Sequence, residues 1–166
     1  STTSIQDWCG QAFQQFNHRN KGWSVELRSY FENAGDQNFK LPGDHLEDEL
    51  WITLRLDPGK LPQGEIQVIP GAVFARFHHQ QIQASKANAI LTKSGESSIY
   101  TISYPTLGRK LAIHFDTAFP HIIRKWTEAT SKGSTEAILS KRLMNVEYWN
   151  LHNPQDASKR KQLSLD

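Results

Sequence analysis

The chain has 166 residues, a formal charge of +2, and 19 Lys and Arg against 17 Asp and Glu. This length suits one domain, and the absence of an apolar run of about 20 residues means that no segment is expected to span a membrane. A single cysteine excludes an intrachain disulfide framework and every multi-cysteine zinc or iron–sulfur site. The composition therefore predicts one globular domain over residues 1–166.

The start of the chain and its charge distribution add two expectations. The first residue is Ser1 and the only methionine is Met144, which favours a processed product, the C-terminal part of a longer chain. Residues 1–83 contain 7 basic and 10 acidic side chains, and residues 84–166 contain 12 and 7. The basic residues come mostly in pairs rather than in a dense stripe with aromatic platforms, so no nucleic-acid partner is expected.

The first elements are expected to be strands. Apolar residues alternate with polar ones in Trp23–Phe31, and a polar turn separates this run from Gln11–Asn17, which predicts a β-hairpin. The spacing in Ser4–Phe16 would also fit a short helix. The Gly-, Pro- and polar-rich stretch Asn33–Gly43 is expected to be a loop.

A helix is expected over about residues 44–56. Asp44 has the character of an N-cap, and Glu47 follows at capping-box spacing. Acidic residues crowd its first turn, which suits the helix dipole, and Pro58 ends it.

Beyond Gly64 the pattern becomes that of β-strands. Three runs are expected to be strands: Glu65–Pro70, Ala72–Gln80 and Ile82–Thr92. A further hairpin is predicted from Ser98–Tyr104 and Arg109–Phe115, which are rich in β-branched and aromatic residues and flank a Pro- and Gly-containing loop.

The last third leaves two segments open. Residues 119–130 and 136–149 fit helix and strand equally, whereas Pro154–Leu163 is expected to be a short terminal helix with proline in its first turn. The sum predicts a mostly β, α+β domain. It would have an antiparallel sheet of about 7–9 strands, one packed helix over about residues 44–56 and a short C-terminal helix.

Motifs of the common enzymes are missing. The sequence contains no GxGxxG, GxxxxGK[ST] or GxSxG, which argues against nucleotide enzymes and α/β-hydrolases. No base is tied by sequence to Cys9, which is interpreted as a small buried residue. His78 and His79 adjoin on an expected strand, so their side chains should point to opposite faces. No cofactor is implied.

One histidine and aspartate set could bind a metal. His114 and Asp116 are two residues apart on an expected strand, so they share a face, and His121 follows at a loop edge. These three, with His78 or His79, would suit a metal-dependent hydrolase. The alternative interpretation is a histidine at a strand end that bonds to its own aspartate.

Aromatic residues could line an apolar ligand cavity between helix and sheet. Equally, aromatics on strands are ordinary core residues. The candidates are Trp8, Trp23, Phe31, Phe74, Phe77, Trp126 and Trp149.

Several stretches together resemble the C-terminal half of a group of uncharacterised bacterial exported lipoproteins, some of them labelled septum formation inhibitor. The stretches are Thr3–Gln11, Ser29–Glu32, Asp36–Phe39, Leu46–Trp51, Tyr104–Arg109, Ile113–Phe115 with Phe119-Pro120, and Tyr148–Asn150. The resemblance covers nearly the whole chain. It implies export to the cell envelope, at the outer membrane or in the periplasm, and attachment to the membrane through an upstream lipid anchor. It implies no activity, so it assigns no site residues.

These observations favour a non-catalytic envelope domain over an enzyme. The expected partner is its own N-terminal region, another envelope protein or an apolar ligand. The metal-dependent hydrolase is the alternative.

Overall fold

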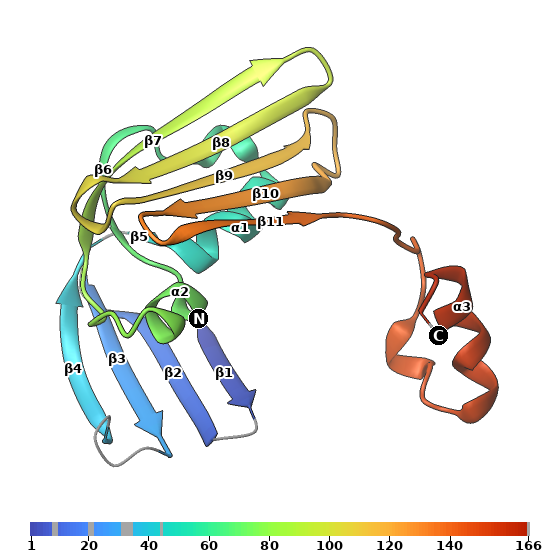
Figure 1. The fold of residues 1–166 in the computed structure, drawn as a ribbon, viewed down its shortest axis with the longest axis horizontal. Helices are drawn as coiled ribbons and strands as arrows, with labels where there is room; N and C mark the ends of the chain where they lie inside the picture. The colour runs from blue at the N-terminus through green and yellow to red at the C-terminus, as the bar shows by residue number, and fades with distance from the viewer. Residues whose placement is uncertain (8–9, 20–21, 31–34, 44, 166) are drawn as a thin grey trace.

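The computed structural model describes residues 1–7, 10–19, 22–30, 35–43 and 45–165. Within these residues the chain forms two β-sheets of four and seven strands, two helices associated with them, and a separate C-terminal segment (Figure 1). The mostly β architecture with a packed helix and a short C-terminal helix is the one that the sequence predicts. The strands divide between two sheets. β4 is an edge strand of the first sheet, and β5 is an edge strand of the second.

The first sheet is an antiparallel meander of four strands in chain order. Phe16, Trp23 and Val25 are buried on the face that turns toward the rest of the molecule. The predicted N-terminal hairpin is confirmed, but the expected loop over 33–43 contains a strand. The strands are β1 (Thr2–Asp7), β2 (Gly10–Arg19), β3 (Gly22–Ser29) and β4 (Gln37–Pro42).

The second sheet has the order β11-β10-β9-β8-β7-β6-β5. All neighbours are antiparallel except β5, which pairs in parallel with β6. The predicted hairpin over 98–115 is confirmed, and the open segment 119–130 contains a strand over 123–130. The strands are β5 (His45–Leu46), β6 (Gly64–Ile69), β7 (Ser85–Ser94), β8 (Ser97–Tyr104), β9 (Arg109–Asp116), β10 (Ile123–Thr130) and β11 (Gly133–Ile138).

Helix α1 (Glu47–Leu56) packs on one face of the second sheet. Leu50 and Leu54 are one turn apart and fill the main core together with the inward side chains of β8 and β9, among them Tyr100 and Ile113. A short 3₁₀ turn, η2 (Pro58–Lys60), follows the helix, and the Asp57 side chain accepts a hydrogen bond from Gly59 N.

The beginning of α1 differs from the prediction. Its N-cap is Leu46 rather than Asp44, which lies outside the described residues. Glu47 is buried and forms an ion pair with Arg109, so its carboxylate is not available to a capping box. A tertiary contact therefore replaces the local role that the spacing indicated.

Helix α2 (Ala72–Phe77) stands where the sequence predicted a strand over 72–80. The backbone N–H of Ala72 donates to the Asp48 carboxylate at 3.2 Å, which satisfies a free donor at the start of this helix. Because that acceptor comes from α1, 24 residues earlier, the alternating pattern of the local sequence could not reveal it.

The segment after β11 runs away from both sheets and folds into a small unit of its own, here called the C-terminal arm, residues 139–165 (Figure 1). It contains η4 (Tyr148–Asn150), η5 (Pro154–Ala157) and α3 (Ser158–Gln162). The last two make the predicted terminal helix over 154–163 partly 3₁₀. The open segment 136–149 completes β11 and is then irregular. None of the helices in the described ranges has the length and apolar character needed to cross a bilayer.

Candidate functional site

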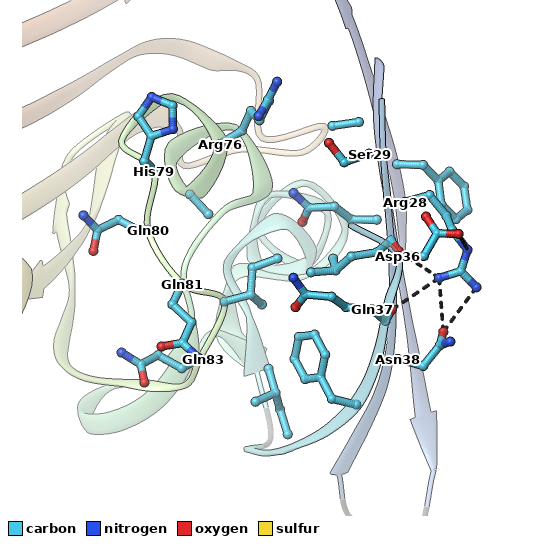
Figure 2. Close-up of a pocket in the computed structure, with 18 residues that line it drawn as sticks. Arg28, Ser29, Asp36, Gln37, Asn38, Arg76, His79, Gln80, Gln81 and Gln83 are labelled. Atoms are coloured by element: carbon cyan, nitrogen blue, oxygen red, sulfur yellow. Dashed lines mark hydrogen bonds and ion pairs between the residues drawn. The ribbon is translucent and has the colours of Figure 1, made fainter. Parts of the chain in front are cut away.

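A groove lies between the first sheet and the α2–β7 segment, with a volume of about 870 Å³ (Figure 2). One wall comes from β2, β3 and β4, and the other from α2 and the loop before β7. Amides dominate its polar lining, and two arginines, one aspartate and one histidine also contribute. These polar residues are Gln14, Arg28, Ser29, Asp36, Gln37, Asn38, Arg76, His79, Gln80, Gln81 and Gln83.

Gln14 is the residue that singles out this groove. It lies on the inward face of β2, between Ala12 and Phe16, where the strand pattern otherwise buries apolar side chains. The residue is only 7% exposed, and its Oε1 atom has no hydrogen-bond partner among the described residues. A buried amide oxygen without a donor costs stability, and this one lies in the lining of the groove.

Arg28 organises the polar contacts on the outer side of the first-sheet wall, across the strands from α2 (Figure 2). Its guanidinium donates to the backbone oxygens of Leu27 and Gln37 and to the side chain of Asn38 (Figure 2). It also lies 3.7 Å from the Asp36 carboxylate. These contacts tie β3 to the beginning of β4 and leave the arginine charge balanced by a neighbouring acid.

The base of the groove is apolar and is continuous with the smaller core. Leu27, Phe39, Leu41 and Ile82 line the groove and also pack against the cluster of Phe16, Trp23, Val25, Leu46 and Ile69. The amide side chains of the groove therefore lie above tightly packed apolar residues, as is usual for ligand sites.

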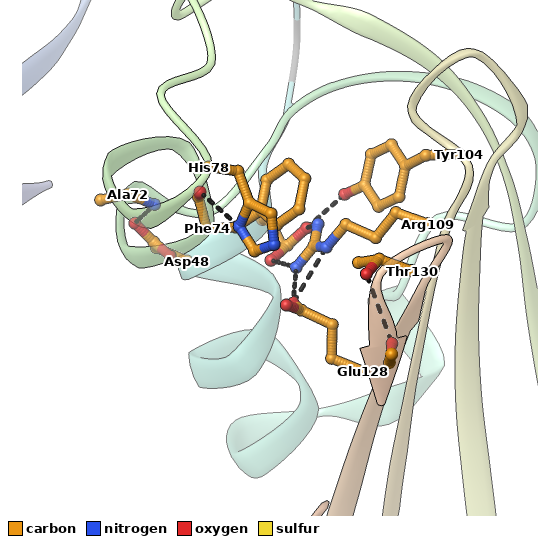
Figure 3. A network of polar contacts seen from close by, with 10 residues as sticks. Asp48, Ala72, Phe74, His78, Tyr104, Arg109, Glu128 and Thr130 are labelled. Atoms are coloured by element: carbon orange, nitrogen blue, oxygen red, sulfur yellow. Dashed lines mark hydrogen bonds and ion pairs between the residues drawn. The ribbon is translucent and has the colours of Figure 1, made fainter. Parts of the chain in front are cut away.

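The position of α2, and with it the second wall, depends on a buried ion-pair network (Figure 3). Arg109 of β9 is 4% exposed and donates to two carboxylates, Glu47 of α1 and Glu128 of β10. Its guanidinium carbon lies 4.1 Å from the centre of the Phe74 ring of α2. A cation stacked on an aromatic face is attracted to it, so one arginine joins both helices to the second sheet.

Two more hydrogen bonds complete this network. The Tyr104 hydroxyl donates to Glu47, and the pKa of Tyr104 lies well above its usual range, mainly because the hydroxyl is buried and also because Glu47 is near. Burial also raises the pKa of Asp48, which the hydrogen bond from Ala72 opposes. Asp48 therefore joins α1 to α2 through the hydrogen bond that it accepts from Ala72 N–H.

The predicted metal ligands do not converge. His114 and Asp116 do share the outward face of β9, as expected, and His121 Nδ1 lies 3.3 Å from the backbone oxygen of Asp116. However, Arg124 binds both carboxylate oxygens of Asp116 and lowers its pKa. Across the described part of the chain, no three His, Cys, Asp or Glu side chains are grouped as a metal site.

The remaining histidine and cysteine predictions have mixed outcomes. His78 and His79 follow α2 and are not on a strand. The His78 ring stacks on Phe74, whereas His79 lines the groove. Cys9 lies outside the described residues.

The predicted aromatic residues are dispersed rather than gathered around one cavity. Trp23 belongs to the smaller core, and Trp126 packs edge-on against Trp51 at the main core. Phe74 is buried under Arg109, whereas Phe77 and Trp149 are exposed. Trp8 and Phe31 lie outside the described residues.

Comparison with known proteins adds no relative: no family model, no curated protein and no solved structure matches this chain. The site is therefore defined by its geometry alone. Sequence reasoning missed the groove because glutamines are ordinary surface residues. The one available signal was Gln14, a polar residue at an inward position of an alternating strand.

Proposed function

We propose that this chain is a non-catalytic binding domain of the cell envelope whose groove holds an extended polypeptide segment of a partner protein. The observation that carries the proposal is the Gln14 Oε1 atom, which is buried in the groove lining without a hydrogen-bond donor from any residue that the structure describes. A bound peptide group would supply that donor, because every non-proline residue carries a backbone N–H.

The amides of the lining favour a ligand with many hydrogen-bonding groups. Each glutamine and asparagine side chain offers both a carbonyl acceptor and N–H donors, the same pair of functions that a peptide group offers in return. Arg28 is balanced by Asp36 and Glu26, so this wall does not present an isolated positive charge to an anion. The apolar base would accept the side chains that alternate along an extended segment.

The source of that segment follows from the resemblance to exported lipoproteins. It would be the upstream region of the same protein or another envelope protein, and the envelope location is part of the proposal.

Selection of random 12-residue peptides displayed on phage tests the proposal, with the purified full chain as bait. Peptides that are enriched should bind the wild-type chain and bind the Gln14→Leu variant at least about tenfold more weakly, the effect of losing roughly one buried hydrogen bond. The matched control is Gln15→Leu, because Gln15 is the next residue of β2 and faces the opposite side.

Each outcome decides the matter. Enriched peptides that tolerate Gln15→Leu and not Gln14→Leu support the groove. A selection without binders, or binders that tolerate Gln14→Leu, would contradict it.

A further inference from the structure

The C-terminal arm carries exposed apolar side chains that its small fold does not cover. Tyr148 and Trp149 are 75% and 64% exposed and contact each other edge to face. Met144 and Leu165 are also at least half exposed. In Figure 1 the arm stands apart from both sheets, so the body of the molecule does not cover these residues.

The same arm is basic. Its described residues include Lys141, Arg142, Lys159, Arg160 and Lys161, against the acids Glu147 and Asp156. Both acids are engaged within the arm: Glu147 accepts from the Asn150 side chain, and Asp156 accepts from the backbone of Asn153. Both acids thus have partners within the arm, and its described residues keep a net positive charge.

These charges surround an apolar hollow. A cavity of about 600 Å³ lies within the arm, between its beginning and its end. Leu143, Val146 and Leu163 give it apolar surface, while Lys141, Arg142 and Arg160 contribute basic side chains. Lys141 donates to Ser164 Oγ, which holds the two ends of the arm together.

We propose that the C-terminal arm binds the surface of an anionic lipid bilayer, independently of the groove. Tyrosine and tryptophan favour the interface between headgroups and hydrocarbon, where one end of the ring is apolar and the other is wet. Lysine and arginine are attracted to anionic headgroups, and exposed Met144 and Leu165 add apolar area for the acyl boundary.

A nucleic acid fits the arm less well than a bilayer does. It would match the basic side chains and could stack on the aromatic rings. It offers nothing to the exposed aliphatic side chains or to the apolar surface of the cavity. The combination of charge and aliphatic exposure favours the bilayer.

Flotation of the full chain with vesicles tests this proposal. The vesicles contain phosphatidylcholine with about 30 mol % phosphatidylglycerol, and the comparison vesicles contain phosphatidylcholine alone. We expect the chain to float with the anionic vesicles in about 50 mM salt and to be largely released by about 500 mM salt, where charges are screened within about 4–5 Å.

Two variants and two controls assign the binding to the arm. Tyr148→Ser with Trp149→Ser, and separately Lys141→Gln with Arg142→Gln, should each lower the floated fraction at least about fivefold. Phe119→Ser removes an exposed aromatic ring from the body, and Lys86→Gln with Lys93→Gln removes two exposed charges from β7. Both controls should float like the wild type.

Three results would overturn the proposal. The first is absence of flotation with anionic vesicles. The second is flotation that both arm variants retain. The third is binding to a single-stranded homopolymeric RNA that outcompetes the vesicles and is lost in the same variants, which would make the arm a nucleic-acid surface. Loss of vesicle binding leaves the peptide selection for the groove unaffected, so the two proposals fail separately.

Discussion

The Arg109 guanidinium and the Glu47 carboxylate, 62 residues apart in the sequence, form a bidentate ion pair. The two side chains are 2% and 4% exposed. Glu128 takes the remaining guanidinium edge, with 2.6 Å between its Oε2 and Arg109 Nη2. The pair joins the first turn of α1 to the second sheet, and Phe74 brings α2 into the same assembly. The geometry of the groove therefore depends on one buried cation outside it.

Replacing that cation should be severely destabilising. Arg109→Met leaves the buried Glu47 and the partly buried Glu128 without their partner, and we expect the free energy of unfolding to fall by about 3–5 kcal/mol in urea titrations. Arg124→Met is the control, because it removes an arginine from an exposed pair with Asp116 and should change unfolding far less. If both variants lowered the free energy of unfolding equally, burial of the Arg109 ion pairs would contribute no more stability than an exposed ion pair does.

The buried amide of the groove should behave in the opposite way. Gln14→Leu replaces an unpartnered acceptor with an apolar side chain of similar size, so we expect the free chain to become more stable by about 1 kcal/mol. Thermal unfolding without peptide measures this, with Gln15→Leu as the comparison on the other face. A destabilised Gln14→Leu would indicate that the amide already has a partner and would weaken the assignment of the groove.

The joint between α1 and α2 should depend on pH. Burial raises the pKa of Asp48 above the ordinary value of 3.8, so the folded chain holds this proton more tightly than the unfolded chain. The ionised carboxylate therefore costs stability above its raised pKa, and this cost disappears as the pH falls through that pKa toward 3.8. Asp48→Asn keeps an acceptor for Ala72 N–H without the charge.

We therefore expect Asp48→Asn to be more stable than the wild type at about pH 7 and the difference to shrink toward about pH 4. Urea unfolding over this range gives the difference at each pH. Glu65→Gln, an exposed carboxylate of β6, serves as the control. A difference that stays constant with pH would remove titration of Asp48 as its cause.

Zinc should not stabilise the chain. Both oxygens of Asp116 are bound by Arg124, so a metal at His114 and His121 would first have to break that ion pair. We expect the melting temperature to be the same with Zn²⁺ and with a chelator. A rise with Zn²⁺ that His114→Ala and His121→Ala abolish would make the metal-dependent hydrolase, so far the alternative, the leading function.

Local patterns were sufficient for elements whose determinants are local. The hairpin of β8 and β9 follows from alternation around Pro105 and Gly108, and Gly108 has the positive φ of 55° that the turn requires. Those residues carry the necessary information within one short segment.

Elements with distant determinants were not predictable. The first N–H of α2, that of Ala72, donates to the Asp48 carboxylate. Glu47 forms an ion pair with Arg109 instead of accepting hydrogen bonds at the start of its own helix. The groove is assembled from β2 and from the loop before β7, which are distant in sequence. Residue spacing describes one segment of the sequence at a time, so it cannot predict contacts between distant segments.

The apolar side chains beneath the groove belong at once to the site and to the smaller core. Any widening of the groove would expose Leu27, Phe39 and Ile82 to water. If the groove holds a polypeptide segment as proposed, that segment would accordingly have to match a width that the packing of the core already sets. Association would then need little rearrangement of the backbone, and discrimination among ligands would rest on their thickness as much as on their hydrogen bonds.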